Sequence, residues 1–227
     1  MERVEVLQTV RRDPGTPSTS QSNAKCTDCG GTGWIYPQQQ TSAGVRRCAC
    51  LLERITESRF QLIAARFRDC SLDNYEPIDE VQKQAVRAIQ KDPGDSFFLH
   101  GMYGRGKTHL EVAQYKIIAK SGKPCLFRSM SDLLHEIQSA ELRGEPSVTL
   151  ERVKYENTFH LFIDDIDKFK PSEFRSQAIF DLIDGIYRRN LSVTITSNLS
   201  VTGLTQLERL EPAVLRRIDD MCIAVQV

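Results

Sequence analysis

A glycine-rich loop between an apolar run and a helix-compatible segment is the strongest constraint on the fold. Residues 97–108 read Phe-Phe-Leu-His-Gly-Met-Tyr-Gly-Arg-Gly-Lys-Thr. The pattern Gly-x4-Gly-Lys-Thr is typical of a phosphate-binding loop, in which backbone N–H groups surround phosphate oxygens. Glycine permits positive φ angles and a close approach that a Cβ would block, and the helix that follows adds unpaired N–H groups. Residues 101–108, the phosphate loop, are therefore predicted to bind a nucleotide.

Individual residues of the phosphate loop have separate predicted tasks in binding ATP or ADP. Lys107 reaches the β- and γ-phosphates, and the hydroxyl of Thr108 is a ligand of Mg²⁺. The other candidate nucleotide-binding residues are Gly101, Gly104, Arg105, Gly106 and His109. The alternative is a glycine turn that precedes a lysine by chance. The strand pattern before the loop and the helix pattern after it argue against that alternative.

Two acids end a second apolar run, His160-Leu-Phe-Ile-Asp164-Asp165. A strand that delivers acids at its carboxyl end is where an α/β sheet places its active site. Asp164 is predicted to hold Mg²⁺, and Asp165 to polarise the water that attacks the γ-phosphate. Because Asp165 is one methylene shorter than the glutamate usual at such a position, we expect slow hydrolysis. A third strand pattern, 192–198, ends at Asn198, which is predicted to orient the same water.

Strand and helix patterns alternate through most of the chain, which predicts an α/β fold with a parallel sheet. Ser131 and Asp132 are expected to cap the helix that ends near Leu142. The expected strands are 97–100, 124–128, 160–164, 192–198 and 222–227, and the expected helices are 78–91, 109–119, 131–142, 149–156, 172–189 and 213–218.

Four of the seven cysteines lie close together in the sequence: Cys26, Cys29, Cys48 and Cys50. Two close pairs can bring four thiolates to one tetrahedral Zn²⁺, and the glycines after Cys29 permit a turn whose N–H groups face the sulfurs. Clustered cysteines in a cytosolic chain favour a metal over disulfides. A short loop-rich segment has almost no core without one. Trp34 either packs on this turn or stacks on a base, and both interpretations remain open.

The N-terminal segments differ in composition from the rest of the chain. Residues 1–25 are polar and rich in Pro, Ser and Thr, which predicts a flexible tail. Residues 26–50 form the predicted zinc-binding module, 51–70 a basic connecting helix, and 71–227 the ATPase domain. In the connecting helix, apolar residues recur near helical spacing between arginines. Its basic face is either solvated or a docking surface for a protein or nucleic acid.

Whole-chain composition limits the class of protein without naming a partner. A length of 227 residues suits one medium domain with a small appendage. The chain has 30 lysine and arginine residues and 30 aspartate and glutamate residues. The formal net charge is therefore zero and indicates no type of partner. No apolar run approaches the roughly 18 residues that a membrane helix needs, and the N-terminus lacks a signal-peptide core. We therefore expect a cytoplasmic protein.

Three motifs together carry a family resemblance over about residues 67–227. Gly-Met-Tyr-Gly-Arg-Gly-Lys-Thr, Leu-Phe-Ile-Asp-Asp-Ile-Asp and Thr-Ile-Thr-Ser-Asn resemble the Walker A, Walker B and sensor 1 elements of AAA+ ATPases. The Asp-Asp doublet is similar to that of bacterial replicative-helicase loaders of the DnaC and DnaI type, within the IstB-like ATP-binding family. Cys-x2-Cys-Gly-Gly-Thr-Gly-Trp followed by Cys-x-Cys also resembles the N-terminal region of DnaI-like loaders. Transposition ATPases of the IstB type usually begin with a helical region instead.

The resemblance implies a P-loop NTPase core with a five-stranded parallel sheet of order 5-1-4-3-2 and a nucleotide at a subunit interface. Arg217 matches the position from which a family arginine reaches the neighbour's γ-phosphate, and Arg216 is the fallback. Because the chain stops after its last strand, the resemblance implies that the C-terminal lid domain is missing. Family members bind single-stranded DNA through the helices after strand two, the region of Arg128, Arg143 and Lys154.

The resulting expectation is a weak ATPase that loads the hexameric replicative DNA helicase onto single-stranded DNA. It implies self-association through the ATPase domain and no membrane partner. Two alternatives remain. One is a transposition accessory ATPase that binds duplex DNA, and the other is a nucleotide-binding adaptor that does not hydrolyse ATP because Asp165 is a poor base.

Overall fold

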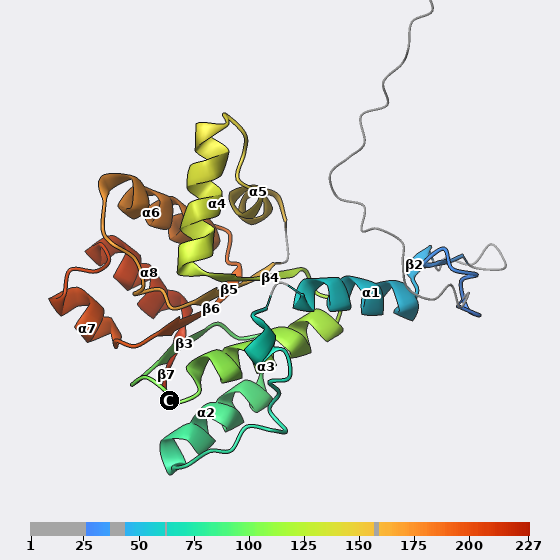
Figure 1. Ribbon diagram of the computed structural model, residues 1–227, viewed down its shortest axis with the longest axis horizontal. Helices are drawn as coiled ribbons and strands as arrows, with labels where there is room; N and C mark the ends of the chain where they lie inside the picture. The colour runs from blue at the N-terminus through green and yellow to red at the C-terminus, as the bar shows by residue number, and fades with distance from the viewer. Residues whose placement is uncertain (1–25, 37–43, 62, 157–158) are drawn as a thin grey trace, which may run out of the picture. The chain divides into compact units, whose positions relative to one another are not determined.

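A computed structural model describes residues 26–36, 44–61, 63–156 and 159–227 (Figure 1). The chain divides into two compact units, Met1–Cys50 and Leu51–Val227. The predicted tail, 1–25, lies outside the described residues. Along the described ranges, every helix is too short or too polar to span a lipid bilayer.

The N-terminal unit contains a two-stranded antiparallel sheet, which the sequence patterns did not predict. Strand β1 (Trp34–Ile35) pairs with β2 (Arg46–Arg47). Before β1 the chain makes a tight turn, in which the backbone N–H of Gly30 donates to the carbonyl of Cys26 at 2.8 Å. Gly30 takes a φ of 61°, a conformation that favours glycine. Trp34 is 40% exposed.

The predicted connecting helix is shorter than expected. Helix α1 (Ala49–Phe60) ends well before residue 70, and a 3-10 turn, η1 (Ala65–Phe67), follows after a break. Ile63 explains the break, because it leaves the helical path to become 1% exposed in an apolar cluster with Tyr115. The guanidinium of Arg68 then holds the backbone at this point, with Nε donating to the carbonyl of Ile63 at 3.1 Å.

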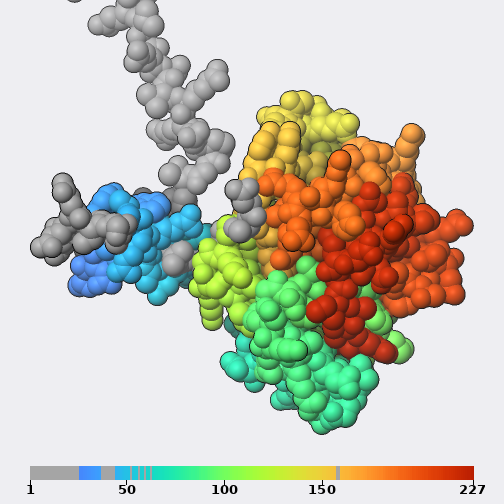
Figure 2. Space-filling model, turned by 180° about the vertical axis from the view of Figure 1, so that it is seen from behind, coloured from blue at the N-terminus to red at the C-terminus, as the bar shows by residue number. Residues whose placement is uncertain are grey.

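The C-terminal unit is built on a five-stranded parallel sheet. Its order is β4-β5-β6-β3-β7. If β3 to β7 are counted as strands 1 to 5 of this sheet and the order is given from β7, it is 5-1-4-3-2, so the order implied by the resemblance is confirmed. Seen from the opposite face, the red C-terminal end lies against the green segment that contains α2 (Glu80–Lys91) and β3 (Phe97–His100) (Figure 2), in agreement with the pairing of β3 with β7. The strands are β3 (Phe97–His100), β4 (Cys125–Ser129), β5 (His160–Asp164), β6 (Ser192–Ser197) and β7 (Ile223–Gln226).

Helices cover both faces of this sheet (Figure 1). Helices α2 (Glu80–Lys91) and α3 (Lys107–Lys120) pack on one face. The other face is covered by α4 (Met130–Leu142), α5 (Val148–Tyr155), α6 (Glu173–Arg188), α7 (Val201–Gln206) and α8 (Pro212–Met221). Strands β3 to β6 are therefore buried along most of their length, which explains their nearly continuous apolar runs, whereas the edge strand β7 is largely exposed.

Side-chain alternation along β3 shows how the sheet joins the two helical layers. Phe98 packs in the cluster beneath α4, α6 and α8, whereas Phe97 and Leu99 pack with α2 and α3. Because all five strands are parallel, their carboxyl ends meet at one edge. The phosphate loop after β3 and the acids after β5 are therefore brought to the same edge of the sheet.

Two local features differ from the predicted helices. Ser129, rather than Ser131, caps α4, and its Oγ accepts a hydrogen bond from the backbone N–H of Asp132 at 3.1 Å. Asp132 thus lies in the first turn of α4 and not at its cap. Helix α7 was not predicted; it begins after Ser200, whose Oγ accepts from the N–H of Gly203 at 3.1 Å.

Candidate nucleotide site and cysteine cluster

Two glycines of the phosphate loop are required by its geometry. Gly104 and Gly106 have φ angles of 76° and 89°, and α3 starts directly after Gly106. A Cβ on Gly106 would lie 2.6 Å from the ring of Tyr75, whereas one on Gly104 would meet open space. The loop therefore needs glycine at Gly106 for both backbone conformation and space.

Lys107 lies at the centre of the phosphate loop, with only 6% of its surface exposed. Its ammonium donates to the carbonyls of Gly101 and Met102, each at 2.9 Å, and to Oδ1 of Asn198 at 3.0 Å. Burial lowers the pKa of Lys107, and the nearby carboxylates of Asp165, Asp167 and Asp164 oppose that shift. The predicted phosphate ligand and the predicted water-orienting amide are thus in direct contact.

The two predicted Mg²⁺ ligands are also in contact. The hydroxyl of Thr108 donates to Oδ1 of Asp164 at 2.9 Å, and Thr196 on β6 donates to the same oxygen at 2.7 Å. Hydroxyl and carboxylate oxygens are the ligands that Mg²⁺ prefers. Thr108 and Asp164 therefore fit a magnesium ion, which would neutralise phosphate charge when a nucleotide is bound.

Asp165 takes a strained conformation beside Asp164. Its φ is 57°, in the left-handed region, and its N–H donates to Oγ1 of Thr196 at 2.8 Å. Nδ2 of Asn198 reaches Oδ1 of Asp165 at 3.4 Å. Burial, followed by the charges of Asp164 and Asp167, raises the pKa of Asp165. A carboxylate with a raised pKa is a better proton acceptor than an ordinary surface aspartate.

Asp167 is part of this site, although no role was predicted for it. It is 9% exposed. Its Oδ1 accepts from Oγ of Ser197 and from the backbone N–H of Asn198, both at 3.1 Å. Its Oδ2 accepts from Nδ2 of Asn198 at 3.2 Å. The signal in the sequence is the third acid of Asp-Asp-Ile-Asp, two residues after Asp165.

Glu111, one helical turn after Lys107, is a second acid that the sequence patterns missed. Its side chain is completely buried. Burial, and then the carboxylates of Asp164 and Asp165, raises its pKa well above the usual range. Burial thus favours the protonated form of Glu111 behind the phosphate loop.

Arg105 and His109, both predicted to bind nucleotide, contact the segment that precedes α2 and the first turn of that helix. Arg105 forms an ion pair with Asp79, and its carbonyl accepts from the hydroxyl of Tyr75 at 3.0 Å and from Nε2 of Gln82 at 2.8 Å. Nε2 of His109 lies 2.9 Å from the carbonyl of Ser71. This segment therefore holds the outer side of the phosphate loop in place.

A cavity of about 520 Å³ lies over the phosphate loop. His109, Asp165 and Asn198 line it together with Lys107 and Thr108. Arg66 and Phe67 of η1, to which no nucleotide role was assigned, line it as well, with the Arg66 guanidinium 4.4 Å from the Phe67 ring centre. The cavity thus combines polar groups for phosphates with an aromatic edge.

Arg217 is engaged within its own chain. Its Nη2 donates to Oδ1 of Asp184 at 2.7 Å, and its guanidinium lies 4.9 Å from the ring centre of Phe180. The side chain of Arg216 is 85% exposed, and its Nε lies 4.0 Å from Oδ2 of Asp220, a long distance for an ion pair. Arg217 is thus held by contacts within its own chain, whereas the side chain of Arg216 is largely exposed to solvent.

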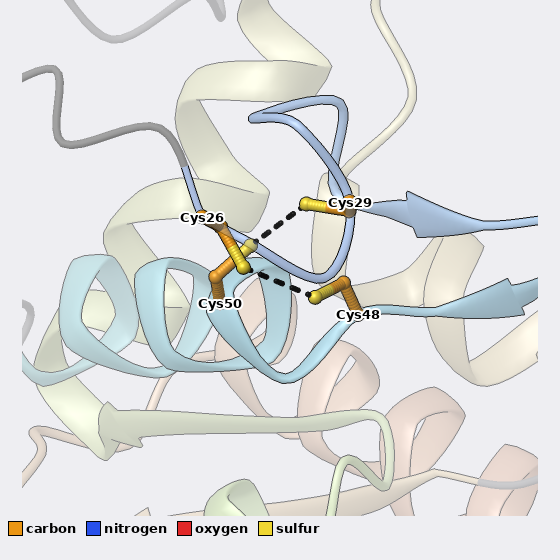
Figure 3. A group of neighbouring side chains, drawn as sticks. All are labelled: Cys26, Cys29, Cys48 and Cys50. Atoms are coloured by element: carbon orange, nitrogen blue, oxygen red, sulfur yellow. Dashed lines mark hydrogen bonds between the residues drawn. The ribbon is translucent and has the colours of Figure 1, made fainter.

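The four N-terminal cysteines form a compact cluster (Figure 3). The Sγ atoms of Cys26, Cys29, Cys48 and Cys50 all lie within 4.8 Å of one another. Cys26 and Cys48 are 3.6 Å apart at sulfur, and Cys29 and Cys50 are 3.4 Å apart. A tetrahedral Zn²⁺ with Zn–S bonds of about 2.3 Å needs sulfurs about 3.8 Å apart. The backbone N–H of Gly33 donates to Sγ of Cys29 at 3.2 Å, so the cluster fits a tetrathiolate metal site.

The sheet order, the phosphate loop and the acids of β5 define a P-loop ATPase fold of the AAA+ class. The family described as IstB-like ATP binding protein matches residues 78–227, and the chain belongs to it. Over 146 residues the chain is 30% identical to the replicative helicase loader DnaC of Buchnera aphidicola subsp. Baizongia pistaciae, covering 61% of this chain and 59% of that protein. The chain thus spans about three-fifths of the length of the DnaC relatives it matches.

Two solved structures and an insertion-sequence protein extend the comparison. The crystal structure of the DnaC helicase loader is 27% identical, with a TM-score of 0.64, covering 72% of this chain and 99% of that one. The DnaI structure shares the fold at 21% identity and a TM-score of 0.60, covering 72% and 94%. A putative ATP-binding protein of an insertion sequence in Mycobacterium tuberculosis is 22% identical, covering 75% of this chain and 67% of that protein.

Proposed function

We propose that this protein is an ATP-dependent loader of a hexameric replicative DNA helicase onto single-stranded DNA. The observation that supports this most is the likeness to the DnaC helicase loader, at 27% identity over 99% of that chain. The cysteine cluster, a second feature that resembles DnaI-like loaders, supports the same choice. The loader would act as a switch, holding its partners while ATP is bound and releasing them after slow hydrolysis.

The nucleotide site would divide its tasks among residues already in contact. Lys107 would bind the β- and γ-phosphates, while Thr108 and Asp164 hold Mg²⁺, which neutralises phosphate charge when bound. Asp165 would accept a hydrogen bond from the attacking water. Asn198, fixed by Asp167, would orient that water against the γ-phosphate. The short side chain of Asp165 fits a slow switch rather than a fast ATPase.

Self-association would complete this site with an arginine from a neighbouring subunit. In our proposal Arg216 supplies it, because Arg217 is already paired with Asp184 at 2.7 Å. Such an arginine stabilises charge that develops on the transferred phosphoryl group. ATP hydrolysis would therefore depend on the assembly of subunits on their partners.

The N-terminal cysteine cluster would hold one Zn²⁺ through Cys26, Cys29, Cys48 and Cys50. A metal at this place stabilises a unit whose described regular structure is two strands of two residues each. Together with the basic face of α1, the zinc-binding module would contact the helicase. Arg54, which is exposed on α1, suits an acidic partner surface.

Co-purification with the cognate hexameric helicase tests the proposal. We expect a complex with ATP present and a weaker one with Lys107→Ala, which loses the phosphate contact. Lys91→Ala, an exposed lysine at the end of α2, is the matched control and should bind like the wild type. Absence of any complex between the wild-type protein and the helicase in ATP would overturn the loader.

A transposition accessory ATPase is the second candidate. It is favoured by the family assignment and by the likeness to the insertion-sequence protein over 75% of this chain. This candidate requires ATP-dependent binding to duplex DNA and indifference to the helicase. A nucleotide-binding adaptor without hydrolysis would instead form ATP complexes but give no phosphate in a single-turnover assay, with Lys107→Ala as the reference for lost binding.

A further inference from the structure

A hollow lies at the edge of the sheet opposite to the nucleotide cavity. It measures about 250 Å³ and is found where β5 and β6 begin, beside the C-terminal half of α3. His160 and Ser192, the first residues of these two strands, are register partners, so their side chains leave the sheet on the same side. Among the described residues that line the hollow, Lys123 carries a positive charge and none is acidic. This hollow is called the amino-edge pocket below.

A chain of buried hydrogen bonds fixes the proton on the ring of His160. Nε2 of Gln114 donates to the carbonyls of Pro93 and Asp95, at 2.9 and 3.0 Å, so Oε1 of Gln114 is an acceptor. The hydroxyl of Thr194 donates to that oxygen at 3.0 Å, which uses its single proton. Nε2 of His160, 2.9 Å from the same hydroxyl, is therefore the ring nitrogen that carries the proton.

Nδ1 of His160 is consequently an acceptor without a proton. Burial, followed by the charge of Lys123, lowers the pKa of His160 from 6.5 to about 3, so the ring is neutral near pH 7. Within the described part of the chain Nδ1 makes no hydrogen bond, and it is not one of the unpartnered polar atoms that are closed to solvent. A deeply buried residue whose lone pair is open to a pocket suits a ligand that donates a hydrogen bond.

Ser192 adds a second acceptor to the amino-edge pocket, and Lys123 adds a cation. Oγ of Ser192 donates its proton to the carbonyl of Gly94 at 3.3 Å, so its lone pairs remain for a ligand. Nζ of Lys123 lies beside Gly94 as well, because a Cβ added to that glycine would be 3.6 Å from it. The pocket thus combines two hydrogen-bond acceptors with one positive charge.

Much of the remaining wall is apolar. Ile118, Phe159 and Leu191 line the pocket and are all buried. A ligand that fits has several N–H donors for the two acceptors, an anionic oxygen for Lys123 and an apolar body. An α-amino acid has all of these, because its ammonium has three donors and its carboxylate pairs with a lysine. A hydroxy acid, with one donor, satisfies only one of the two acceptors.

We propose that the amino-edge pocket binds a free α-amino acid with an apolar side chain, its ammonium at His160 and Ser192 and its carboxylate at Lys123. The inference does not depend on the proposed function, because the described residues that line this pocket are all different from those that line the nucleotide cavity. A failed helicase or ATP experiment would therefore leave it standing.

Isothermal titration calorimetry of the full chain with three matched probes tests the class of ligand. L-Leucine, L-leucic acid and isocaproic acid share a carbon skeleton and a carboxylate, and they carry an ammonium, a hydroxyl and no donor beside it. We expect the affinity to fall in that order, by roughly three- to tenfold at each step, because each step leaves one more acceptor unpaired. Equal affinities for the three probes, or no binding of L-leucine, would overturn the proposal.

Substitutions at the rim test where L-leucine binds. Lys123→Gln removes the cation and Ser192→Ala removes one acceptor, and each should weaken L-leucine binding by roughly three- to tenfold. Lys120→Gln changes an exposed lysine at the end of α3, close to the pocket in sequence, and should bind like the wild type. Wild-type affinity in both Lys123→Gln and Ser192→Ala would place the bound amino acid elsewhere and refute the site.

Nitrogen NMR of the ring-labelled histidines tests the role of His160 without altering its fold. The chain has four histidines, and the signals missing from His160→Gln identify those of His160. We expect a protonated Nε2 and an unprotonated Nδ1 in the free protein, and a shift of Nδ1 on addition of L-leucine with little change at Nε2. Isocaproic acid should leave both signals in place. A protonated Nδ1 in the free protein, or an Nδ1 signal that saturating L-leucine does not move, would contradict the assignment.

Discussion

Asp167 accepts both the backbone N–H and the side-chain amide of Asn198, at 3.1 and 3.2 Å. Asn198 is thereby fixed at two points, with its Oδ1 turned to Lys107 at 3.0 Å and its Nδ2 towards Asp165 at 3.4 Å. The carboxylate of Asp167 thus determines where the amide of Asn198 lies. Asp167 is a positioning residue for the proposed water-orienting group.

Replacing Asp167 should therefore slow hydrolysis more than it weakens ATP binding. Asp167→Ala frees the Asn198 side chain, and a misplacement of about 1 Å in a catalytic group lowers turnover by about ten- to a hundredfold. Steady-state kinetics should show the loss in kcat, with a small change in KM. Asp181→Ala, at an exposed position on α6, is the control. Equal kcat values in Asp167→Ala and Asp181→Ala would show that Asp167 does not position Asn198 for hydrolysis.

The two adjacent arginines of α8 should respond differently to substitution. Arg217→Ala removes the closer of the two arginine partners of Asp184, leaving Arg188 at 3.5 Å, and should lower the free energy of unfolding by about 1–3 kcal/mol, measured by urea unfolding. Arg216→Ala removes an exposed side chain and should change stability by less than about 0.5 kcal/mol. In the assembled protein, however, Arg216→Ala should reduce ATP turnover at least about tenfold. A turnover loss in Arg217→Ala alone, without loss of stability, would return the trans role to Arg217.

Local patterns predicted the parts of the site that are continuous in sequence. The phosphate loop and Asp164 lie in short motifs whose spacing reflects backbone geometry, and the alternation of strand and helix patterns was enough for the parallel sheet. The roles of Tyr75 and Arg217 depend on partners far along the chain, Arg105 and Asp184, which no local pattern contains. Such contacts form only when the fold brings residues that are distant in sequence together.

The sequence patterns did not predict the break after α1, for a related reason. Ile63 continues the apolar helical spacing of the connecting segment, yet in the fold it packs beside Tyr115 on the sheet unit. Burial of one large side chain outweighs the continuation of an exposed helix, whose propensity terms are a few tenths of a kcal/mol per residue. Helical spacing alone contains no information about that competition.

Gly106 should tolerate a methyl group much less well than Gly104. Both have positive φ angles, so each alanine variant is strained by about 1 kcal/mol or more. Only at Gly106 does the new Cβ meet Tyr75, at 2.6 Å. We expect Gly106→Ala to lose more stability in urea unfolding than Gly104→Ala and to lose ATP binding. Adding Tyr75→Ala should recover part of the stability lost by Gly106→Ala, and strict additivity of the two changes would contradict the clash.

Removal of one thiolate should abolish metal binding by the N-terminal unit. Freshly purified wild-type protein should contain about one zinc per chain, and Cys48→Ser should contain almost none, because a tetrahedral site with three thiolates is much weaker. Elemental analysis measures this directly. Cys222→Ser changes a buried cysteine on the sheet unit and should retain the metal. Zinc-free wild-type protein, or full zinc in Cys48→Ser, would be incompatible with a tetrathiolate site.

His160 should make stability depend on pH. It is 4% exposed, and burial, followed by the charge of Lys123, lowers its pKa from 6.5 to about 3. Its Nε2 lies 2.9 Å from Oγ1 of Thr194, and its ring stacks on Phe162 at 4.2 Å. Between these two pKa values the unfolded chain binds the proton and the folded chain does not. The stability contributed by neutral His160 is therefore complete above pH 6.5 and is lost as the pH falls towards 3.

Urea unfolding of the wild type and of His160→Gln at a series of pH values measures this contribution. Glutamine keeps a group that can hydrogen-bond Thr194 but does not titrate in this range. Well below pH 6.5, the free energy of unfolding of the wild type should fall more steeply, by up to about 1.4 kcal/mol per pH unit, than that of His160→Gln. His135→Gln, at an exposed position on α4, should keep the wild-type slope. Parallel pH curves for the wild type and His160→Gln would mean that the folded protein accommodates the charged imidazole.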